Sequence, residues 1–253
     1  MNIALITGAN KGIGFEVAKQ LAEKGFHVYL GSRNLENGIE AVEKLKSEGL
    51  TNIEAIQIDV TDDRSVQAAR EEIGKKTNTL DVLINNAGIT GAQLDEAGNM
   101  VPQTAAATDV SIFKNVYETN VYGVVRVTQA FLDLMKEVAA PRIVMVSSSQ
   151  GSITLHSDPT YKYYKHKGVV YLSSKSALNM YTVNLAYELR DTDFKINAVS
   201  PGFTKTDLNF NNGTGSVEDA AKRIVKYALI DNNGPTGKFF CEETNPDGGE
   251  IPW

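Results

Sequence analysis

The glycine-rich segment near the amino terminus constrains the fold more than any other part of the sequence. An apolar run at residues 3–6 leads into Thr7-Gly8-Ala9-Asn10-Lys11-Gly12-Ile13-Gly14, and a helical pattern then continues to Lys24. Gly8 permits a tight turn, while Gly12 and Gly14 let a pyrophosphate and a neighbouring strand approach the backbone at the start of the helix. The spacing G-x-x-x-G-x-G differs from the commoner G-x-G-x-x-G. The order of strand, glycine turn and helix nevertheless predicts a dinucleotide-binding turn.

The rest of the chain continues the alternation of apolar runs and helical patterns. Expected strands lie at 26–30, 53–58, 81–84 and 142–146, and expected helices at 35–47, 62–75, 109–137 and 171–190. Near-continuous apolar strands separated by helices are typical of a parallel sheet that is covered on both faces. Residues 89–107 are small and polar and are expected to form a loop. Since no linker or repeat interrupts the pattern, we predict one α/β domain over residues 1–253.

Charge and cysteine content limit the partners and the compartment. The net charge is −6, from 25 Lys and Arg against 31 Asp and Glu, which argues against nucleic acid or an anionic membrane as a partner. No apolar run approaches the length of about 20 residues that spans a bilayer. The glycine segment begins too close to Met1 for a signal peptide, and the lone Cys241 fits a reducing compartment. We therefore expect a cytoplasmic protein that does not bind a membrane.

The end of the second expected strand indicates which dinucleotide binds. An NAD site usually places an acid here for the ribose 2′-hydroxyl, whereas a 2′-phosphate requires a cation. The sequence offers Arg33 and, in the glycine turn, Lys11, with no acid at the strand end. This pair favours NADP(H). The third strand ends in Asp59-Val60, whose carboxylate could accept a hydrogen bond from an adenine amino group or cap the following helix.

A Tyr-x-x-x-Lys pattern provides the candidate catalytic pair, Tyr171 and Lys175. Residues four apart share a helix face, and a nearby cation favours a phenolate, so this tyrosine could exchange a proton near pH 7. The pattern also occurs at Tyr161 and Tyr163, within the polar stretch 160–167, which we interpret as a solvated loop. The Tyr171 pair differs because it opens a sustained amphipathic helix.

Other polar residues fall at strand ends or inside a helix. Asn86-Ala87-Gly88 follows the fourth strand, and Ser147-Ser148-Ser149 follows the fifth. Asn120 and Gly123 lie inside the expected helix 109–137, where both are unfavourable by propensity, which indicates a kink or a polar role.

Taken in order, these motifs resemble the short-chain dehydrogenase/reductase family along nearly the whole chain. The asparagine-lysine form of the glycine turn, Arg33 and the ending through Trp253 look most like its NADPH-dependent carbonyl reductases, although Asn37 stands where those enzymes place a second arginine. The resemblance implies a single doubly wound Rossmann-type domain with a mostly parallel seven-stranded sheet and no metal. It also implies that Ser148 binds the substrate oxygen, that Tyr171 protonates it, that Lys175 lowers the phenol pKa and holds the ribose, and that Asn120 holds a water linking Lys175 to solvent. The implied cofactor-binding residues are Gly8, Asn10, Lys11, Gly12, Ile13, Gly14, Arg33, Asp59, Val60, Asn86, Ala87, Gly88, Tyr171, Lys175, Pro201, Gly202, Phe203, Thr204 and Thr206.

The interval between serine and tyrosine departs from the family pattern. The family's usual shorter interval would select Tyr161, but the 30 residues from Tyr171 to Pro201 match the family. Roughly ten extra residues therefore precede Tyr171, and we expect an insertion at about 153–169. We expect it to form the rim of the substrate pocket, and its tyrosines to cover the helices through which family members oligomerise. This favours a monomer over a homo-oligomer.

The expected function is transfer of hydride from NADPH to a small-molecule ketone or aldehyde. Two alternatives remain open. The same residues serve an NADP-dependent dehydrogenase acting on a secondary alcohol. A protein that senses NADP(H) without turnover is the other alternative, although a sensor needs only the glycine turn.

Overall fold

The computed structural model describes residues 2–253 and contains a seven-stranded parallel sheet. Its strands are β1 (Ile3–Ile6), β2 (His27–Ser32), β3 (Ile53–Gln57), β4 (Val82–Asn85), β5 (Arg142–Val146), β6 (Lys195–Val199) and β7 (Phe239–Phe240). They are arranged in the order β3-β2-β1-β4-β5-β6-β7, and every neighbouring pair is parallel. The order reverses between β1 and β4, so a crevice opens at the carboxyl ends of these strands.

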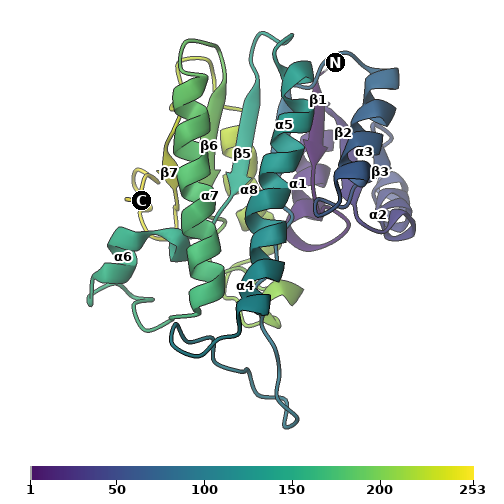
Figure 1. Ribbon diagram of the computed structural model, residues 1–253. Coiled ribbons are helices and arrows are strands. Elements are labelled where there is room, and N and C mark those ends of the chain that lie inside the picture. The colour runs from purple at the N-terminus through teal and green to yellow at the C-terminus, as the bar shows by residue number, and fades with distance from the viewer. Residues whose placement is uncertain (1) are drawn as a thin grey trace.

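Helices cover both faces of the sheet, as predicted. On one face lie α1 (Gly12–Glu23), α2 (Leu35–Ser47) and α8 (Val217–Ala228). On the other face, nearer the viewer in Figure 1, lie α3 (Asp63–Lys76), α4 (Val110–Tyr117), α5 (Gly123–Met135) and α7 (Val169–Glu188). Because side chains alternate along a strand, Ala4 and Ile6 of β1 join the first core while Ile3 and Leu5 join the second. This double covering confirms the doubly wound α/β fold.

The long helix expected at 109–137 is divided into three parts. A π-helical turn, η1 (Glu118–Tyr122), separates α4 from α5 and contains the fully buried Asn120. Gly123 follows it, and a Cβ there would lie 2.8 Å from Cγ2 of Val60, so the glycine lets the helix approach the loop after β3. The irregularity indicated by these two residues is therefore present as a π-helical turn.

Two irregular segments lie at the carboxyl edge of the sheet, at the lower end of Figure 1. Residues 86–109 contain no helix and one isolated antiparallel bridge, between Leu94 and Met100. Residues 147–168 contain the short 3₁₀ helix η2 (Ser149–Gly151), the helix α6 (Ile153–Ser157) and several turns. A further 3₁₀ helix, η3 (Asp207–Asn209), lies in the loop after β6.

Two kinds of feature are absent from residues 2–253. None of the helices there has the length and apolar character needed to cross a membrane. Nor does this part of the chain bring together three or more His, Cys, Asp or Glu side chains in a metal-binding group.

Candidate active site

Two cavities adjoin at the carboxyl edge of the sheet and contain most of the predicted site residues. The first, here called the glycine-turn cavity, has a volume of about 720 Å³. The second, the tyrosine cavity, measures about 660 Å³. Ile13, Thr206 and Leu208 line both cavities and form a shared wall. Predicted residues in the glycine-turn cavity are Gly8, Asn10, Lys11, Gly12, Ile13, Gly14, Arg33, Asp59, Val60, Asn86, Ala87, Gly88 and Thr206. Those in the tyrosine cavity are Ile13, Ser148, Tyr171, Pro201, Gly202, Phe203, Thr204 and Thr206.

The glycine turn is locked to the end of β4 by Asn86. Its Nδ2 donates to the carbonyl oxygens of Thr7 and Gly8, at 2.9 and 3.0 Å. A Cβ on Gly14 would lie 2.4 Å from this nitrogen and 2.7 Å from the Gly8 oxygen. The backbone at the start of α1 can therefore lie against the turn only because residue 14 has no side chain. This arrangement leaves the amino end of α1 open to the cavity, where a phosphate can bind.

Arg33 and Lys11 both line the glycine-turn cavity, but their partners differ. Lys11 donates to Asp207 Oδ2 at 2.7 Å, in a pair that is largely exposed. The expectation that no carboxylate competes for these cations is therefore wrong for Lys11. Asp207 is 196 residues away in sequence, so local spacing could not reveal it. Arg33 lies directly after β2, and in residues 2–253 its side chain forms no ion pair.

Asp59 lines the glycine-turn cavity but does not cap a helix. Its Oδ1 accepts from the backbone N and the hydroxyl of Thr61, at 2.9 and 2.7 Å. The cap of α3 is Asp62, which accepts from the backbone N of Arg64. The structure therefore excludes the helix-capping role of Asp59, and a hydrogen bond from an adenine amino group stays a prediction.

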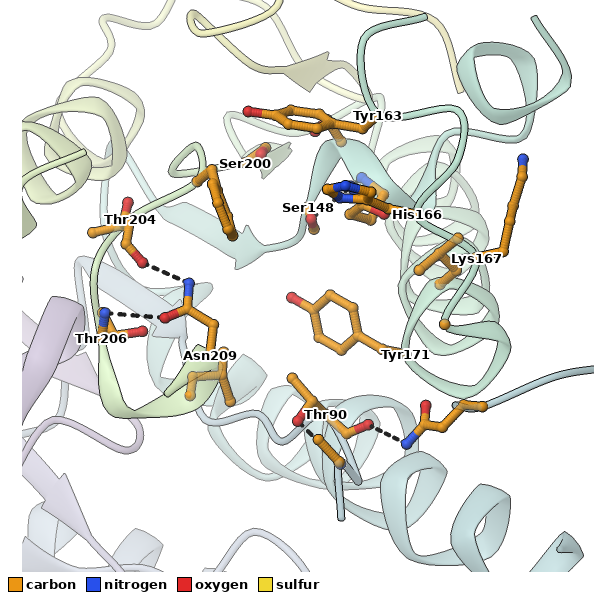
Figure 2. Close-up of a pocket in the computed structure, with 18 of the residues that line it drawn as sticks. Thr90, Ser148, Tyr163, His166, Lys167, Tyr171, Ser200, Thr204, Thr206 and Asn209 are labelled. Atoms are coloured by element: carbon orange, nitrogen blue, oxygen red, sulfur yellow. Dashed lines mark hydrogen bonds between the residues drawn. The ribbon is translucent and has the colours of Figure 1, made fainter. Parts of the chain in front are cut away.

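Tyr171 projects into the tyrosine cavity from the first turn of α7, as Figure 2 shows. Ser148 lies at the end of β5 and lines the same cavity. Burial raises the pKa of Tyr171 to about 12, and the hydroxyl of Ser148 opposes this rise. The neighbouring Ser147 is different, because its hydroxyl donates to Asn179 at 2.6 Å in the core. The structure therefore brings the hydroxyls of Ser148 and Tyr171 together.

Lys175 lies one turn after Tyr171 and is buried behind it. Its Nζ donates to the carbonyl oxygen of Val146 at 2.8 Å and lies 5.6 Å from the centre of the Tyr171 ring. Burial lowers the pKa of Lys175 to about 8. The expected lowering of the Tyr171 pKa by this ammonium is wrong for this structure, because burial of the phenol dominates and moves its pKa upward.

Asn120 joins the loop after β4 to α7. Its Oδ1 accepts from the backbone N of Ile89 at 2.9 Å, and its Nδ2 donates to the Ile89 oxygen and to Ser174 Oγ, at 2.9 and 3.0 Å. A Cβ on Gly88 would lie 3.4 Å from Asn120 Oδ1 and 3.6 Å from Lys175 Nζ, so these groups meet at one point. Both amide donors are used by the protein. The Asn120 side chain could therefore bind a water only as an acceptor, through Oδ1.

Glu243 of the tyrosine cavity was missed in the sequence, whereas Tyr163 and His166 lie in the segment 153–169 that was expected at the rim of the pocket. Tyr163, His166 and Glu243 line its wall, and the first two belong to the stretch interpreted as a solvated loop. That interpretation is wrong, since Tyr161 and Tyr163 are partly buried and pack edge to face at 5.7 Å. The available signal was the number of tyrosines, because a fully solvated loop has little use for several large rings.

From the sequence, we expect the tyrosines of this segment to cover the neighbouring helices. The contacts of Tyr161 and Tyr163 lie elsewhere. Tyr163 donates to Glu243 in the carboxyl-terminal segment, and Tyr161 packs against His156. Tyr122, at the end of η1, and Tyr187 of α7 remain more than half exposed. The covering role is therefore wrong, and the argument that favoured a monomer loses its basis.

Comparison with known proteins identifies the family of the chain. The family model for short chain dehydrogenases matches residues 2–215. (+)-Neomenthol dehydrogenase of Capsicum annuum is 34% identical, with 94% of each chain covered. Salutaridine reductase of Papaver bracteatum is 33% identical, over 96% of this chain and 95% of the relative.

Comparison with solved structures points to the same family. The structure of salutaridine reductase from Papaver somniferum superposes with a TM-score of 0.81 at 30% identity, covering 94% of this chain and 99% of that one. An NADPH-bound carbonyl reductase from chicken fatty liver has the same TM-score, 0.81, at 26% identity, and each chain is covered completely, at 100%. The fold, the family model and these relatives together show that the chain is an oxidoreductase of the short-chain dehydrogenase/reductase family.

Proposed function

We propose that the protein reduces a ketone or aldehyde with NADPH. The observation that carries this proposal is the placement of the Ser148 and Tyr171 hydroxyls in one cavity that shares a wall with the glycine-turn cavity. A carbonyl group bound beside these hydroxyls would lie next to the end of a dinucleotide bound along the glycine turn. Salutaridine reductase and the NADPH-bound carbonyl reductase, which resemble this chain over nearly its whole length, support the same reading.

The residues of the glycine-turn cavity fit a dinucleotide phosphate. Gly14 lets the start of α1 pack against the glycine turn, which leaves the amino end of the helix open to the cavity for a pyrophosphate, and Arg33 offers a cation for a 2′-phosphate. Asp59 and Val60 would contact the adenine, Asn86, Ala87 and Gly88 would lie along the dinucleotide, and Lys175 with Tyr171 would hold the second ribose. The segment from Pro201 to Thr206 would frame the nicotinamide, which supplies the hydride when bound.

The side chains of the tyrosine cavity would donate the proton that carbonyl reduction requires. With its pKa raised to about 12, Tyr171 carries its proton at neutral pH and can donate it to the carbonyl oxygen as negative charge develops there. Ser148 would donate a second hydrogen bond to that oxygen. Oxidation of an alcohol would instead require Tyr171 to lose its proton, which the raised pKa disfavours. At neutral pH the protonated form of Tyr171, which reduction requires, is therefore the abundant one.

The direct test is consumption of NADPH with a panel of ketones and aldehydes of different size. We expect absorbance of NADPH to fall with at least one compound of the panel. Turnover of NADP⁺ with secondary alcohols alone would favour the dehydrogenase. Binding of NADPH without turnover of any compound would favour the sensing protein.

Cofactor selectivity provides the next prediction, which concerns Arg33. Replacing Arg33 with alanine is expected to weaken NADPH binding about 10- to 100-fold, because a charge-assisted hydrogen bond contributes roughly 1.5 to 3 kcal/mol. The affinity for NADH should not change. Dissociation constants for both cofactors, measured by titration of cofactor fluorescence, check this result. Lys11→Ala is the matched control, and its effect should be smaller because Lys11 also pairs with Asp207. Equal affinities of the unaltered protein for NADPH and NADH would contradict the proposed cofactor.

The pH dependence should follow Lys175. A buried lysine with a pKa of about 8 loses its charge as the pH rises through that value, whereas Tyr171 keeps its proton up to about pH 12. We therefore expect kcat/KM for carbonyl reduction to fall above about pH 8, the range in which the ammonium is lost. A pH profile measured with saturating NADPH checks this. A profile that stays flat up to about pH 10, near the ordinary pKa of a lysine, would contradict a lowered pKa of Lys175 or the proposed contact of its ammonium with the ribose.

A further inference from the structure

Glu243 lies in the carboxyl-terminal segment after β7, and its carboxylate joins two parts of the tyrosine cavity that are distant in sequence. Its side chain is only 21% exposed. Oε1 accepts from the hydroxyl of Tyr163 and from Lys162 Nζ, the latter at 3.0 Å. Oε2 accepts from the backbone N of Phe203 at 2.7 Å. One carboxylate therefore binds the segment before α7 with one oxygen and the loop after β6 with the other.

The two side chains held in this way form one aromatic wall of the cavity. The rings of Tyr163 and Phe203 meet edge to face, with their centres 6.1 Å apart, and both rings line the cavity. On its other side Tyr163 packs against His166, at 5.5 Å, and Figure 2 shows these two rings near Ser148. The wall lies beside the reacting hydroxyls, and its shape depends on the distance between two loops that no sheet hydrogen bond connects.

The charge on Glu243 keeps this connection strong. Burial raises the pKa of Glu243, but the hydrogen bonds from Tyr163, Lys162 and Phe203 outweigh it and leave the pKa below its usual value. The carboxylate is therefore ionised at neutral pH. Hydrogen bonds to a charged group are stronger than bonds between neutral groups.

The backbone beside Phe203 is shaped to admit this carboxylate. Gly202 has a φ of +90°, and a Cβ there would lie 2.9 Å from Glu243 Oε2 and 2.5 Å from Arg223 Nη1. Arg223 in turn donates to the carbonyl oxygen of Pro201 at 2.6 Å. Glycine at position 202 thus leaves room for both side chains to reach the loop.

We propose that Glu243 is a positioning residue that sets the shape of the substrate-binding wall by tying Tyr163 to Phe203. It acts through these two rings and does not take part in proton transfer. The inference rests on the proposed function to the extent that the tyrosine cavity holds the carbonyl substrate. Large carbonyl compounds, which must contact the aromatic wall, depend on the tie more than small ones.

Glu243→Ala removes both acceptors and should free the two loops. For a bulky ketone, KM is expected to rise about tenfold, the equivalent of one lost hydrogen bond of about 1.4 kcal/mol, while kcat changes little because Ser148 and Tyr171 keep their places. KM for a small aldehyde should change less. Glu243→Gln keeps one acceptor oxygen but loses the second acceptor and the charge, so it should restore only part of the lost affinity. Tyr163→Phe should raise KM in the same way, and should add little to Glu243→Ala because both changes break the same tie.

A second measurement does not depend on activity. Hydrogen exchange should become faster in Glu243→Ala in two peptides, one covering residues 159–167 and one covering 201–206, because the Phe203 amide loses its acceptor. Glu250→Ala is the matched control, since Glu250 lies in the same terminal segment and its side chain forms only an exposed pair with Lys238. In that variant both the exchange and KM should match the unaltered protein.

The outcomes test the positioning role of Glu243 separately from the proposed function. Faster exchange in both peptides together with a selective rise in KM for the bulky ketone supports the proposal. Unchanged exchange in either peptide overturns it, and so does a uniform fall in kcat with KM unchanged. If the unaltered protein reduces no carbonyl compound, the proposed function fails, and the exchange measurement alone then decides whether Glu243 ties the two loops.

Discussion

Replacing Tyr171 with phenylalanine is expected to lower kcat for carbonyl reduction by at least about 100-fold, the lower end of what a general acid contributes. The phenylalanine ring fills the same space, so the packing of α7 should persist and NADPH should bind with nearly unchanged affinity. The loss follows from the hydroxyl alone, which lies with Ser148 in the tyrosine cavity and keeps its proton at neutral pH. Steady-state kinetics with saturating NADPH, together with a cofactor titration, separate the two effects.

Tyr161→Phe is the matched control for this experiment. Its hydroxyl is buried near Ser149 and Thr244 and makes no well-aligned hydrogen bond within residues 2–253, and the side chain does not line the tyrosine cavity. Turnover of this variant should equal that of the unaltered protein. The family's usual shorter interval from the serine would instead make Tyr161 the proton donor. If Tyr161→Phe were inactive and Tyr171→Phe active, the insertion before α7 and the assignment of the catalytic tyrosine would both be wrong.

Gly14→Ala is expected to damage both the fold and cofactor binding. The added methyl would lie 2.4 Å from Asn86 Nδ2 and 2.7 Å from the Gly8 oxygen, so it must displace the amide that holds the glycine turn. Overpacking of this kind costs about 1 to 3 kcal/mol, and two weakened hydrogen bonds add about 1 kcal/mol each. We expect the free energy of unfolding to fall by about 3 kcal/mol and NADPH affinity to fall about 100-fold. Urea unfolding followed by circular dichroism and a cofactor titration measure these changes.

The same substitution at Gly74 provides the control. Gly74 lies exposed in α3, and a Cβ there would meet only the guanidinium of Arg70, which pairs with Asp133 at the surface and would have to shift. Alanine in an exposed helix interior stabilises by roughly 0.5 to 1 kcal/mol relative to glycine. Since a surface ion pair contributes about 0 to 1 kcal/mol, the free energy of unfolding of Gly74→Ala should stay within about 1 kcal/mol of the unaltered protein, and the variant should bind NADPH normally. Equal damage in both variants would show that the effect at position 14 has nothing to do with the glycine turn.

The sequence predicts those parts of the fold that depend on local pattern. The run 142–146 coincides with β5, and α7 begins two residues before its expected start. The double covering of the sheet also follows, because strands that are apolar on both faces must be buried on both. Asn120 and Gly123 could be recognised in the sequence as a break in α-helical propensity. The type and length of the π-helical turn could not be predicted from them.

Contacts between distant loops could not be predicted in the same way. Lys11 and Asp207 are separated by 196 residues, and Tyr163 and Glu243 by 80, so no period or spacing connects them. The prediction that the pKa of Tyr171 is lowered was wrong for a related reason. The four-residue interval correctly brought Lys175 near the ring, but the depth of burial, which dominates the shift, is decided by the packing of the whole domain.

The wall shared by the two cavities has a consequence for energetic coupling. Ile13, Thr206 and Leu208 contact whatever occupies either cavity, so a dinucleotide that moves this wall also alters the space open to the second ligand. Thermodynamic linkage requires the effect to be reciprocal: the factor by which the dinucleotide changes the affinity for the second ligand equals the factor by which that ligand changes the affinity for the dinucleotide. If a bound dinucleotide shifts these three side chains, the two binding equilibria are coupled, and neither affinity is then a property of one cavity alone.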